Sequence, residues 1–383
     1  MINGEKTITR SLRWGMVGGG RGSQIGYVHR SAATRDGIFE LVAGALDIDA
    51  ERGRAFGIEL GIDASRSYPD YKALFATEAG RSEGIEVVSI ATPNNTHFAM
   101  CKAALEHDLH VVCEKPLCFT VAEAEQLQAL AAQRGRIVGV TYGYSGYQMI
   151  EQARSMVANG DLGDIRVVNF QFAHGFHSAA VEEANPSTRW RVTPEFAGPS
   201  YVLGDLGTHP FYISEVILPH LKVKRLLCTR QSFVQSRAPL EDNATVLMEY
   251  DNGAVATAWI SAVNAGAMHS QKIRITGSRA SIEWWDEHPN QLSYEVQGEP
   301  PKLLDRGMDY LNATALDEDR IGAGHPEGLF DAWSNLYRRF AGAISGIPQR
   351  LPYPGIEAGL EGVRWVENCV RSADLGGVWI DYT

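Results

Sequence analysis

The chain has 383 residues, of which 44% are hydrophobic and 21% charged, as in a folded globular protein long enough for two domains. Its formal net charge of −11 argues against a nucleic acid as the main partner, because phosphate backbones are bound by basic surfaces. No run approaches the ~20 apolar residues of a membrane span, and residues 1–13 lack the apolar core of a signal peptide.

The five cysteines are scattered along the chain and contain no Cys-x-x-Cys pair. This pattern predicts neither a disulfide framework nor a zinc site. We therefore expect reduced thiols in a cytoplasmic protein.

Short apolar runs alternate with helical stretches in the first part of the chain. Strands are predicted at 12–17, 39–46, 87–91, 110–113 and 137–142, and helices at 25–33, 50–60, 71–77, 98–106 and 121–134. Thr120, followed three residues later by Glu123, predicts a capping box at the start of the last of these helices. Continuous apolar strands separated by helices predict a parallel sheet covered on both faces, with its ligand outside the carboxyl ends of the strands.

The pattern of apolar and polar residues changes after a predicted helix at 145–159. Strands are predicted at 165–172, 223–236, 244–250, 254–261, 272–276, 281–285 and 291–295, and helices at 206–217, 328–344 and 357–371. Several of these strands alternate apolar with polar residues, and Asp251-Asn252-Gly253 is a hairpin signal between two of them. We expect an α/β protein whose second sheet is large, mostly antiparallel and open on one side.

A glycine-rich turn, Gly18-Gly19-Gly20-Arg21-Gly22-Ser23, follows the first predicted strand. Gly18 and Gly20 match the first two glycines of G-x-G-x-x-G, and Ser23, small enough for close helix–strand packing, stands at the third position. Such a turn lets the backbone approach a pyrophosphate, which then faces the N–H groups of the next helix. Glycine-rich turns also occur for purely structural reasons. Whether this turn binds a dinucleotide is therefore judged from the residues at the other strand ends.

Asp47 stands at the end of the second predicted strand. A carboxylate there can accept hydrogen bonds from the hydroxyls of an adenosine ribose and would repel a 2′-phosphate, which favours NAD over NADP. The alternative is a helix N-cap, a role that Asp49 could serve instead.

Polar residues also follow the third and fourth predicted strands. Thr92-Pro93-Asn94 ends one strand where a cofactor would lie, and His97 follows, which by itself favours a capping or core role. Lys115 follows the next strand, and its ammonium group suits a substrate oxygen that becomes alkoxide-like as hydride departs. The alternative for Lys115 is an ordinary surface lysine.

Asp205 and His209 are four residues apart, a spacing that places both on one face of a helix. A histidine can take or return a proton near neutral pH, and the carboxylate can orient the imidazole or bind a substrate hydroxyl. The pair would also suit a metal, but a metal site needs a third ligand, so we predict none.

Together these residues resemble the Gfo/Idh/MocA family, the group of glucose–fructose oxidoreductase and inositol dehydrogenase. The resemblance covers essentially the whole chain and rests on the glycine turn, Asp47, Thr92-Pro93-Asn94 with His97, Glu114-Lys115-Pro116 and Gly204-Asp205-x-Gly-x-His209. Trp190-Arg191 and Gly324-His325-Pro326-Glu327-Gly328 most resemble the branch with levoglucosan dehydrogenase and related glycoside-oxidising enzymes.

The resemblance implies a Rossmann domain over residues 1–143 and an α/β domain for substrate binding and oligomerisation over 144–383. The open sheet of that second domain often packs against another subunit in the family, so a homodimer or homotetramer is expected. The implied reaction is NAD-dependent hydride transfer involving a secondary hydroxyl of a sugar, glycoside or cyclitol. His209 would be the general acid/base, Lys115 would polarise the reacting oxygen, and Asp205 would hold the substrate or the imidazole.

The cofactor contacts implied by the resemblance come from the glycine turn and the strand ends. They are Gly18, Gly20, Arg21, Ser23, Ile25, Asp47, Thr92, Asn94, His97, Glu114 and Lys115.

Candidate substrate contacts are Tyr142, Tyr144, Trp190 and His325, because sugar sites combine aromatic platforms with polar groups. Trp190 could equally pack in a core. Arg189 and Arg191 could bind an anionic group or form ion pairs with Glu182, Glu183 or Glu195. Two other functions stay open: a regulator that binds the cofactor without catalysis, and an NAD-dependent enzyme that cleaves glycosides through transient oxidation.

Overall fold

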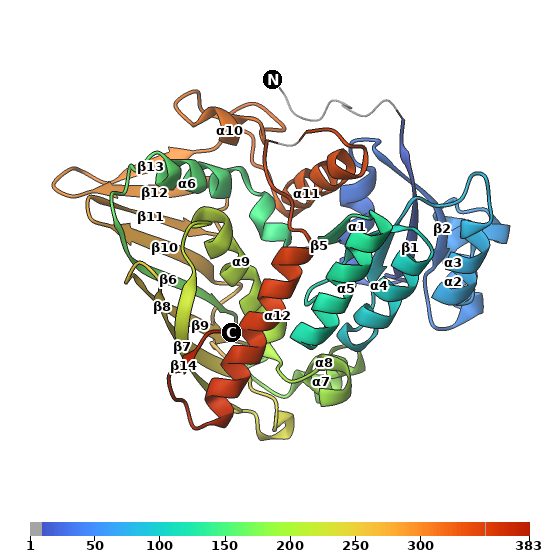
Figure 1. Ribbon diagram of the computed structural model, residues 1–383, viewed down its shortest axis with the longest axis horizontal. Helices are drawn as coiled ribbons and strands as arrows, with labels where there is room; N and C mark the ends of the chain where they lie inside the picture. The colour runs from blue at the N-terminus through green and yellow to red at the C-terminus, as the bar shows by residue number, and fades with distance from the viewer. Residues whose placement is uncertain (1–9, 349) are drawn as a thin grey trace. The chain divides into compact units, whose positions relative to one another are not determined.

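The computed structural model describes residues 10–348 and 350–383, which form two compact units (Figure 1). The N-terminal unit contains the described residues up to Thr141 together with those from Phe330 to Leu360. The C-terminal unit contains residues 142–329 and 361–383.

The N-terminal unit is built on a five-stranded parallel sheet with the order β2-β1-β3-β4-β5, which confirms the predicted parallel sheet. The strands are β1 (Leu12–Gly18), β2 (Phe39–Ala45), β3 (Val87–Ala91), β4 (His110–Cys113) and β5 (Val138–Val140). The helices are α1 (Gln24–Thr34), α2 (Ala50–Glu59), α3 (Tyr71–Ala79), α4 (His97–Glu106), α5 (Val121–Arg134) and α11 (Leu329–Ile344).

Local sequence signals set these elements. Every residue of β3 is buried, as a strand covered on both faces requires. The capping box is confirmed: the Thr120 side chain accepts from the amide of Glu123, whose carboxylate accepts from the amide of Thr120. Helix α5 then ends at Gly135, whose φ of 61° is a left-handed conformation that suits glycine.

The described residues between Phe330 and Leu360 belong to the N-terminal unit, although the sequence grouped them with the second domain. The ring of Tyr337 lies 6.2 Å from that of Trp14 and 5.3 Å from that of Phe39, and a Cβ at Gly139 would overlap the ring of Phe340. Figure 1 shows α11 beside α1. Helical periodicity shows which face of α11 is buried but not which sheet buries it. The predicted domain bounds of 1–143 and 144–383 therefore change in one respect, because the described residues from Phe330 to Leu360 belong to the N-terminal unit.

The C-terminal unit contains a nine-stranded sheet with the order β13-β12-β11-β10-β6-β9-β8-β7-β14. Strands β6 and β9 pair in parallel and the other neighbours are antiparallel, which confirms the predicted mostly antiparallel sheet. The strands are β6 (Ile165–Ala173), β7 (Val223–Gln231), β8 (Asn243–Tyr250), β9 (Val255–Ser261), β10 (Gln271–Gly277), β11 (Ala280–Trp285), β12 (Gln291–Val296), β13 (Lys302–Asp305) and β14 (Ile380–Asp381). The helices are α6 (Gln148–Ala158), α7 (Val181–Ala184), α8 (Pro194–Ala197), α9 (Thr208–Ile217), α10 (Ala313–Leu316) and α12 (Ile356–Asp374), the last of which begins in the N-terminal unit.

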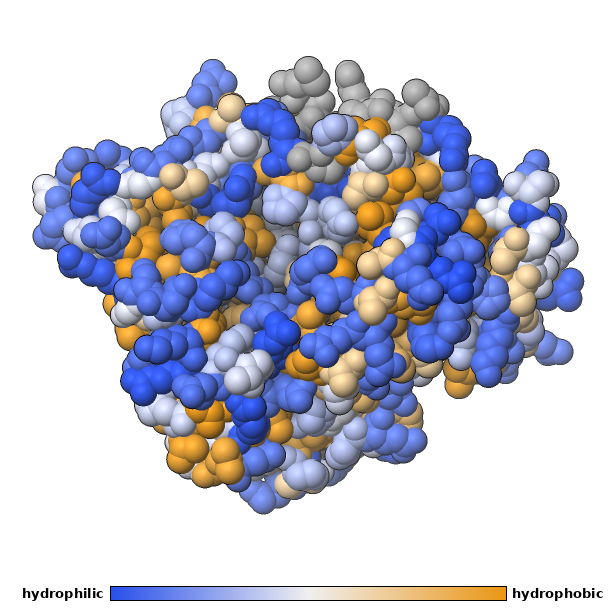
Figure 2. All heavy atoms as spheres, viewed as in Figure 1, coloured by the Kyte–Doolittle hydropathy of each residue, from blue (hydrophilic) through white to orange (hydrophobic). Residues whose placement is uncertain are grey.

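One face of this sheet is covered by helices and the other is open. Met248 on β8 faces inward, and its sulfur lies 3.4 Å from the indole nitrogen of Trp365 on α12. Leu247 and Trp259 alternate with buried neighbours and keep 38% and 37% of their surface exposed. In the view of Figure 2, apolar residues lie in groups among hydrophilic ones. Within the described residues, no helix is both long and apolar enough to cross a membrane.

The packing of α11 predicts the effect of Phe340→Ala. Because Phe340 is 1% exposed and lies on Gly139, its truncation should lower the free energy of unfolding by about 3–5 kcal/mol. Phe233→Ala is the matched control, since Phe233 is 65% exposed and should change stability by no more than about 0.5 kcal/mol. Urea denaturation of both variants measures the difference, and equal losses would show that α11 does not stabilise the N-terminal unit through this ring.

Candidate active site

The glycine turn lies with its backbone against the ends of two neighbouring strands. Gly18 has a φ of 74°, and a Cβ there would overlap the carbonyl oxygen of Ala91 at the end of β3. A Cβ at Gly20 would lie 2.5 Å from the carbonyl oxygen of Leu46, just beyond β2. Only glycine fits both positions, and they lie where the strand order reverses, which is where α/β sheets bind their ligands.

The close packing of α1 on the glycine turn, which the sequence assigned to Ser23, depends on Gly26 instead. The Ser23 hydroxyl accepts a hydrogen bond from the Gly26 amide at 3.1 Å and caps α1. A Cβ at Gly26 would overlap the backbone of Gly19, so Gly26 is the residue that permits close packing of the helix on the turn. The expected packing role of Ser23 is corrected to that of an N-cap.

Side chains on α1 and α2 surround this turn. Arg30 donates to the carbonyl of Gly19 at 2.5 Å and holds the turn, a role that the sequence did not reveal. Arg21 is exposed, forms an ion pair with Glu59 and lies 5.1 Å from the ring centre of Phe56. Ile25 is half-buried in the first turn of α1, so both predicted cofactor contacts retain accessible surface.

Asp47 is free of the alternative capping role, because Asp49 caps α2 by accepting from the amides of Glu51 and Arg52. The Asp47 carboxylate accepts from the guanidinium of Arg52 at 2.8 Å and from the amide of Asp49 at 2.9 Å. The hydrogen bond from Arg52 lowers the pKa of Asp47 below its ordinary value, and the amide lowers it further. Asp47 therefore presents a charged carboxylate beside the glycine turn, as ribose recognition requires.

His97 links the turns that follow β3 and β4. Its ring nitrogens lie 2.7 Å from the carbonyl oxygen of Pro116 and 2.9 Å from that of Thr92. Burial lowers the pKa of His97, and the two carbonyls oppose that shift. Because His97 has no exposed surface, its predicted contact with a cofactor is corrected to a positioning role. Asn94 is also largely buried, and Thr92 bonds to the hydroxyl of Thr96 at 2.6 Å.

Glu114, directly before Lys115, ends a buried chain of hydrogen bonds. The links are Trp14 Nε1 to Ser89 Oγ at 2.9 Å, Ser89 Oγ to Tyr337 Oη at 2.8 Å, Tyr337 Oη to His29 Nδ1 at 2.5 Å and His29 Nε2 to Glu114 Oε1 at 3.1 Å, with Thr141 Oγ1 donating to the same oxygen at 2.5 Å. An indole N–H can only donate and a carboxylate can only accept, so Ser89 accepts from Trp14 at one end of the chain and His29 donates to Glu114 at the other. Burial by itself would raise the pKa of Glu114, but His29, the charge of Lys115 and the Thr141 hydroxyl hold it below its ordinary value. Half-buried Lys115 thus adjoins a carboxylate that stays ionised.

In the C-terminal unit, Asp205 lies in a π-helical turn, Leu203–Gly207, that runs directly into α9 and His209. The predicted regular helix is therefore wider here, a deviation that is frequent at functional sites. The buried carboxylate of Glu241 accepts from the amide of Leu203 at 3.2 Å and holds the start of the turn. A Cβ at Gly207 would lie 2.8 Å from the ring of Trp365, so only glycine allows this close approach.

Aromatic rings surround His209. The ring of Tyr144 is nearly perpendicular to the imidazole at 4.9 Å, and those of Tyr142 and Phe172 lie at 6.1 and 6.2 Å. Tyr142 is 1% exposed and stacks on Tyr212 at 4.6 Å. Its predicted substrate contact is corrected: Tyr142 packs behind His209 and supports it.

Asp205 is paired with Arg191, whose Nε lies 3.3 Å from Oδ2. Arg191 in turn lies over the ring of Trp190 at 4.4 Å. Of the two alternatives left open for Arg191, the structure shows an ion pair, and its partner is Asp205, which the sequence did not indicate. The sequence also missed His174, beside this pair. Its pKa is lowered to about 4, mainly by burial and next by the nearby His177, while the charge of Asp205 opposes the shift.

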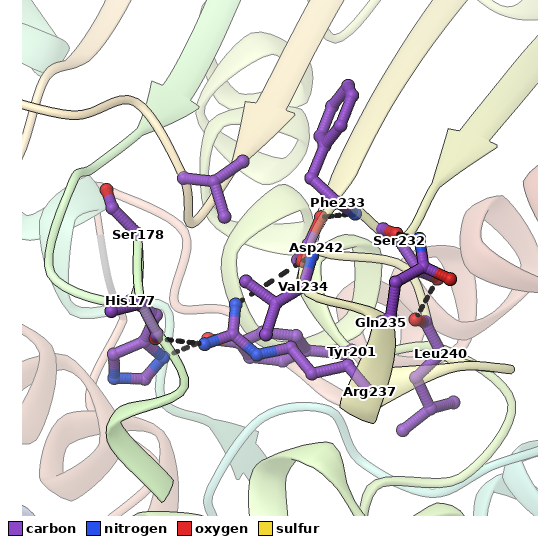
Figure 3. Close-up of polar contacts among 12 residues, drawn as sticks. His177, Ser178, Tyr201, Ser232, Phe233, Val234, Gln235, Arg237, Leu240 and Asp242 are labelled. Atoms are coloured by element: carbon purple, nitrogen blue, oxygen red, sulfur yellow. Dashed lines mark hydrogen bonds and ion pairs between the residues drawn. The ribbon is translucent and has the colours of Figure 1, made fainter.

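A fully buried guanidinium, that of Arg237, anchors the segment that carries these residues. Arg237 binds the Glu182 carboxylate through Nε at 2.9 Å and Nη2 at 3.0 Å, and it donates to the carbonyl of Ala179 at 2.6 Å. Figure 3 shows it between Asp242 and the loop at His177. Paired on both sides, the buried charge fixes the loop, and removal of one partner would leave the other charge uncompensated.

His325 lies in an exposed loop, where its Nδ1 is 3.2 Å from the carbonyl of Gly322. The nearby guanidinium of Arg306, which also binds Glu327 at 2.9 Å, donates to carbonyls of this loop. No contact described for residues 10–348 and 350–383 joins His325 to Asp205 or His209, so its substrate role stays a prediction.

Family models match both units. Residues 12–142 match the oxidoreductase family, NAD-binding Rossmann fold, and residues 154–381 match the oxidoreductase family, C-terminal alpha/beta domain. The chain belongs to the Gfo/Idh/MocA oxidoreductase family. This oxidoreductase is thus an NAD-dependent dehydrogenase, as the resemblance implied.

Several proteins are similar to this Gfo/Idh/MocA oxidoreductase. An uncharacterized oxidoreductase of Bacillus subtilis, YfiI, is 58% identical over the full length of both chains. An inositol dehydrogenase homolog from Azotobacter vinelandii has been solved with NAD+, at 65% identity, full coverage of both chains and a TM-score of 0.97. An inositol dehydrogenase homolog from the same organism, solved with NADH and myo-inositol, gives 64% identity, full coverage of both chains and a TM-score of 0.94. A levoglucosan dehydrogenase of Pseudarthrobacter phenanthrenivorans is 28% identical over 52% of this chain and 49% of its own.

The division of roles between Ser23 and Gly26 is testable. Gly26→Ala should push the glycine turn away from α1 and weaken NAD binding by about tenfold or more, since about 1.4 kcal/mol of distortion suffices. Ser23→Ala removes only the cap, so it should cost about 1 kcal/mol of stability and leave NAD affinity nearly unchanged. NADH fluorescence titration and thermal unfolding of both variants give the two readouts. Unchanged NAD affinity in Gly26→Ala would contradict the role assigned to Gly26.

Proposed function

We propose that this enzyme oxidises a secondary ring hydroxyl of a cyclitol, myo-inositol or a close relative, with NAD+ as hydride acceptor. The observation that carries the proposal is the bound myo-inositol in a homolog that is 64% identical over the full length of both chains. Sugars and glycosides belong to the same wider class of ring carbinols, and they are the next substrates to test.

The N-terminal unit supports this proposal through the fit of NAD to its residues. The glycine turn is open at Gly22, where a Cβ would meet no atom within 4 Å, which leaves room for a pyrophosphate, and the charged Asp47 suits the ribose hydroxyls. When bound, NAD supplies a nicotinamide ring that accepts or returns a hydride. Lys115 would donate a hydrogen bond to the reacting oxygen and stabilise the negative charge that develops there.

In the C-terminal unit, His209 would take the hydroxyl proton during oxidation and return it during reduction. Asp205 would accept a hydrogen bond from the substrate or from the imidazole. Its ion pair with Arg191 at 3.3 Å restrains the carboxylate, which supports a role in orientation rather than in proton transfer.

We also propose a cytoplasmic homodimer or homotetramer. The open face of the nine-stranded sheet, with Leu247 and Trp259 partly exposed, supports self-association. The five cysteines are all buried thiols, which is compatible with a reducing compartment.

A substrate panel tests the proposed function. The purified protein is mixed with NAD+ and myo-inositol, other cyclitols, free sugars or levoglucosan, and NADH is followed at 340 nm. We expect the highest kcat/KM with a cyclitol and one NADH for each ketone formed. NAD binding without turnover of any polyol would contradict the proposal and favour a regulator, and glycoside cleavage without net NADH would favour transient oxidation.

Lys115→Ala and His209→Ala should each reduce turnover by about 100-fold or more while NAD affinity changes little, because each removes a group that acts on the reacting oxygen or its proton. Lys102→Ala and His220→Gln are the matched controls. Lys102 pairs with Glu106 on the surface of α4 and His220 is exposed, so neither should alter turnover. Full activity in either test variant would refute the role assigned to that residue.

Asp47→Ser should lower the preference for NAD over NADP by about tenfold or more. The substitution removes the charge that repels a 2′-phosphate and releases the guanidinium of Arg52 to attract one. Asp49→Ser is the control, because serine can still cap α2 and the Asp47 carboxylate is retained. The ratio of kcat/KM values for the two cofactors is the measurement, and an unchanged ratio in Asp47→Ser would exclude Asp47 as the discriminating residue.

A further inference from the structure

We infer that Tyr144 is a further substrate-contacting residue and that His269 and Asp286 are positioning residues that orient its hydroxyl. The inference rests on the proposed function and deepens it, because it names Tyr144 as the residue beside His209 that binds a substrate hydroxyl. All four residues belong to the C-terminal unit.

Tyr144 lies in the turn Gly143–Gly146 and brings its ring against the proposed acid/base. The ring centres of Tyr144 and His209 are 4.9 Å apart and the planes nearly perpendicular. Tyr144 is half-buried, whereas neighbouring Tyr142 is closed off from solvent. Of these two tyrosines, Tyr144 is therefore the one with surface left to meet a substrate.

The hydroxyl of Tyr144 is held by a directed pair of hydrogen bonds. It lies 3.2 Å from Nε2 of His269, and Nδ1 of the same ring contacts the carboxylate of Asp286, whose side chain is 4% exposed. A carboxylate can only accept, so a neutral His269 carries its proton on Nδ1 and accepts at Nε2 from the tyrosine O–H. With the imidazole neutral, the phenol hydrogen is directed at His269 and the phenol oxygen meets a ligand as an acceptor. Such an acceptor suits a hydroxyl of a cyclitol, which can donate.

The backbone around His269 is strained and firmly held, as expected of a residue whose position matters. The next residue, Ser270, has a φ of 56°, a left-handed conformation that costs energy for a residue with a Cβ. The carboxylate of Glu287 accepts from the amides of His269 at 3.1 Å and Ser270 at 2.7 Å. Gln171 also donates to the Ser270 carbonyl at 3.1 Å. The contacts that offset the strain keep the imidazole at the Tyr144 hydroxyl.

The ring of Phe172 completes this arrangement. Its centre lies 4.4 Å from that of the His269 imidazole, with an interplanar angle of 61°, and 6.1 Å from that of the Tyr144 ring, to which it is perpendicular. An apolar wall on this side strengthens the hydrogen bonds of the pair by excluding water. The position of the Tyr144 hydroxyl, and with a neutral His269 also the direction of its O–H bond, are thus set before a substrate binds.

A double-mutant cycle with NAD+ and myo-inositol tests the inference. Tyr144→Phe should raise the KM for myo-inositol about fivefold or more, the effect of one neutral hydrogen bond, while kcat stays within about twofold. His269→Leu should raise KM similarly, and His269→Gln, which keeps an acceptor near Nε2, should restore most of it. In the Tyr144→Phe background, His269→Leu should add nothing to KM, because the hydroxyl through which it acts is gone.

Tyr310→Phe is the control, since its hydroxyl accepts from the backbone amide of Asp305 and should not affect KM. Melting temperatures and NADH affinity of every variant separate loss of fold from loss of substrate binding. An unchanged KM in Tyr144→Phe would overturn the inference, as would a KM increase from His269→Leu that persists in the Tyr144→Phe background. Failure of the wild-type protein to turn over any cyclitol would instead overturn the proposed function, and this inference with it.

Discussion

The hydrogen bond between His29 and Glu114 is the contact on which the proposed role of Lys115 in the N-terminal unit depends. It joins α1, the helix that starts at the glycine turn, to the strand end that carries Lys115. Each of the five buried polar side chains from Trp14 to Glu114 is hydrogen-bonded to the next, so their burial away from water is tolerated. Tyr337 lies on α11, so a segment near the end of the sequence contributes one residue to this hydrogen-bonded chain. Lys115 is thus placed by a network that reaches across the sheet rather than by its own turn alone.

The C-terminal unit uses a similar principle around His209. A π-helical turn sets Asp205 before α9, and buried charges hold the neighbouring segments in place, with Arg237 at their centre. Buried ions are stable only when they are paired, so conformations of the neighbouring loops, which carry Arg191 and His177, that would break these ion pairs are disfavoured. Rigid support of this kind suits a reaction that depends on positioning a carbinol and removing one proton.

The first sheet was predictable because its strands are continuous apolar runs, four of which end at or shortly before Gly18, Asp47, Asn94 and Lys115. Short or half-exposed strands such as β13 and β14 carry no comparable signal. Residues that act through distant partners were also hidden: His29 bonds to Tyr337, 308 positions away, and Tyr144 to His269, 125 positions away. Local pattern fixes the type of an element and the face it buries, whereas the partner across the fold is set by tertiary packing.

Direct hydride transfer from a ring carbon is the central claim, and isotopic labelling tests it most directly. The protein would be incubated with NAD+ and myo-inositol deuterated at every ring carbon, and the NADH formed would be analysed by mass spectrometry. The account predicts one deuterium in each NADH and a slower rate than with unlabelled myo-inositol when the hydride step limits turnover. NADH without deuterium, or ketone formed without NADH, would contradict it.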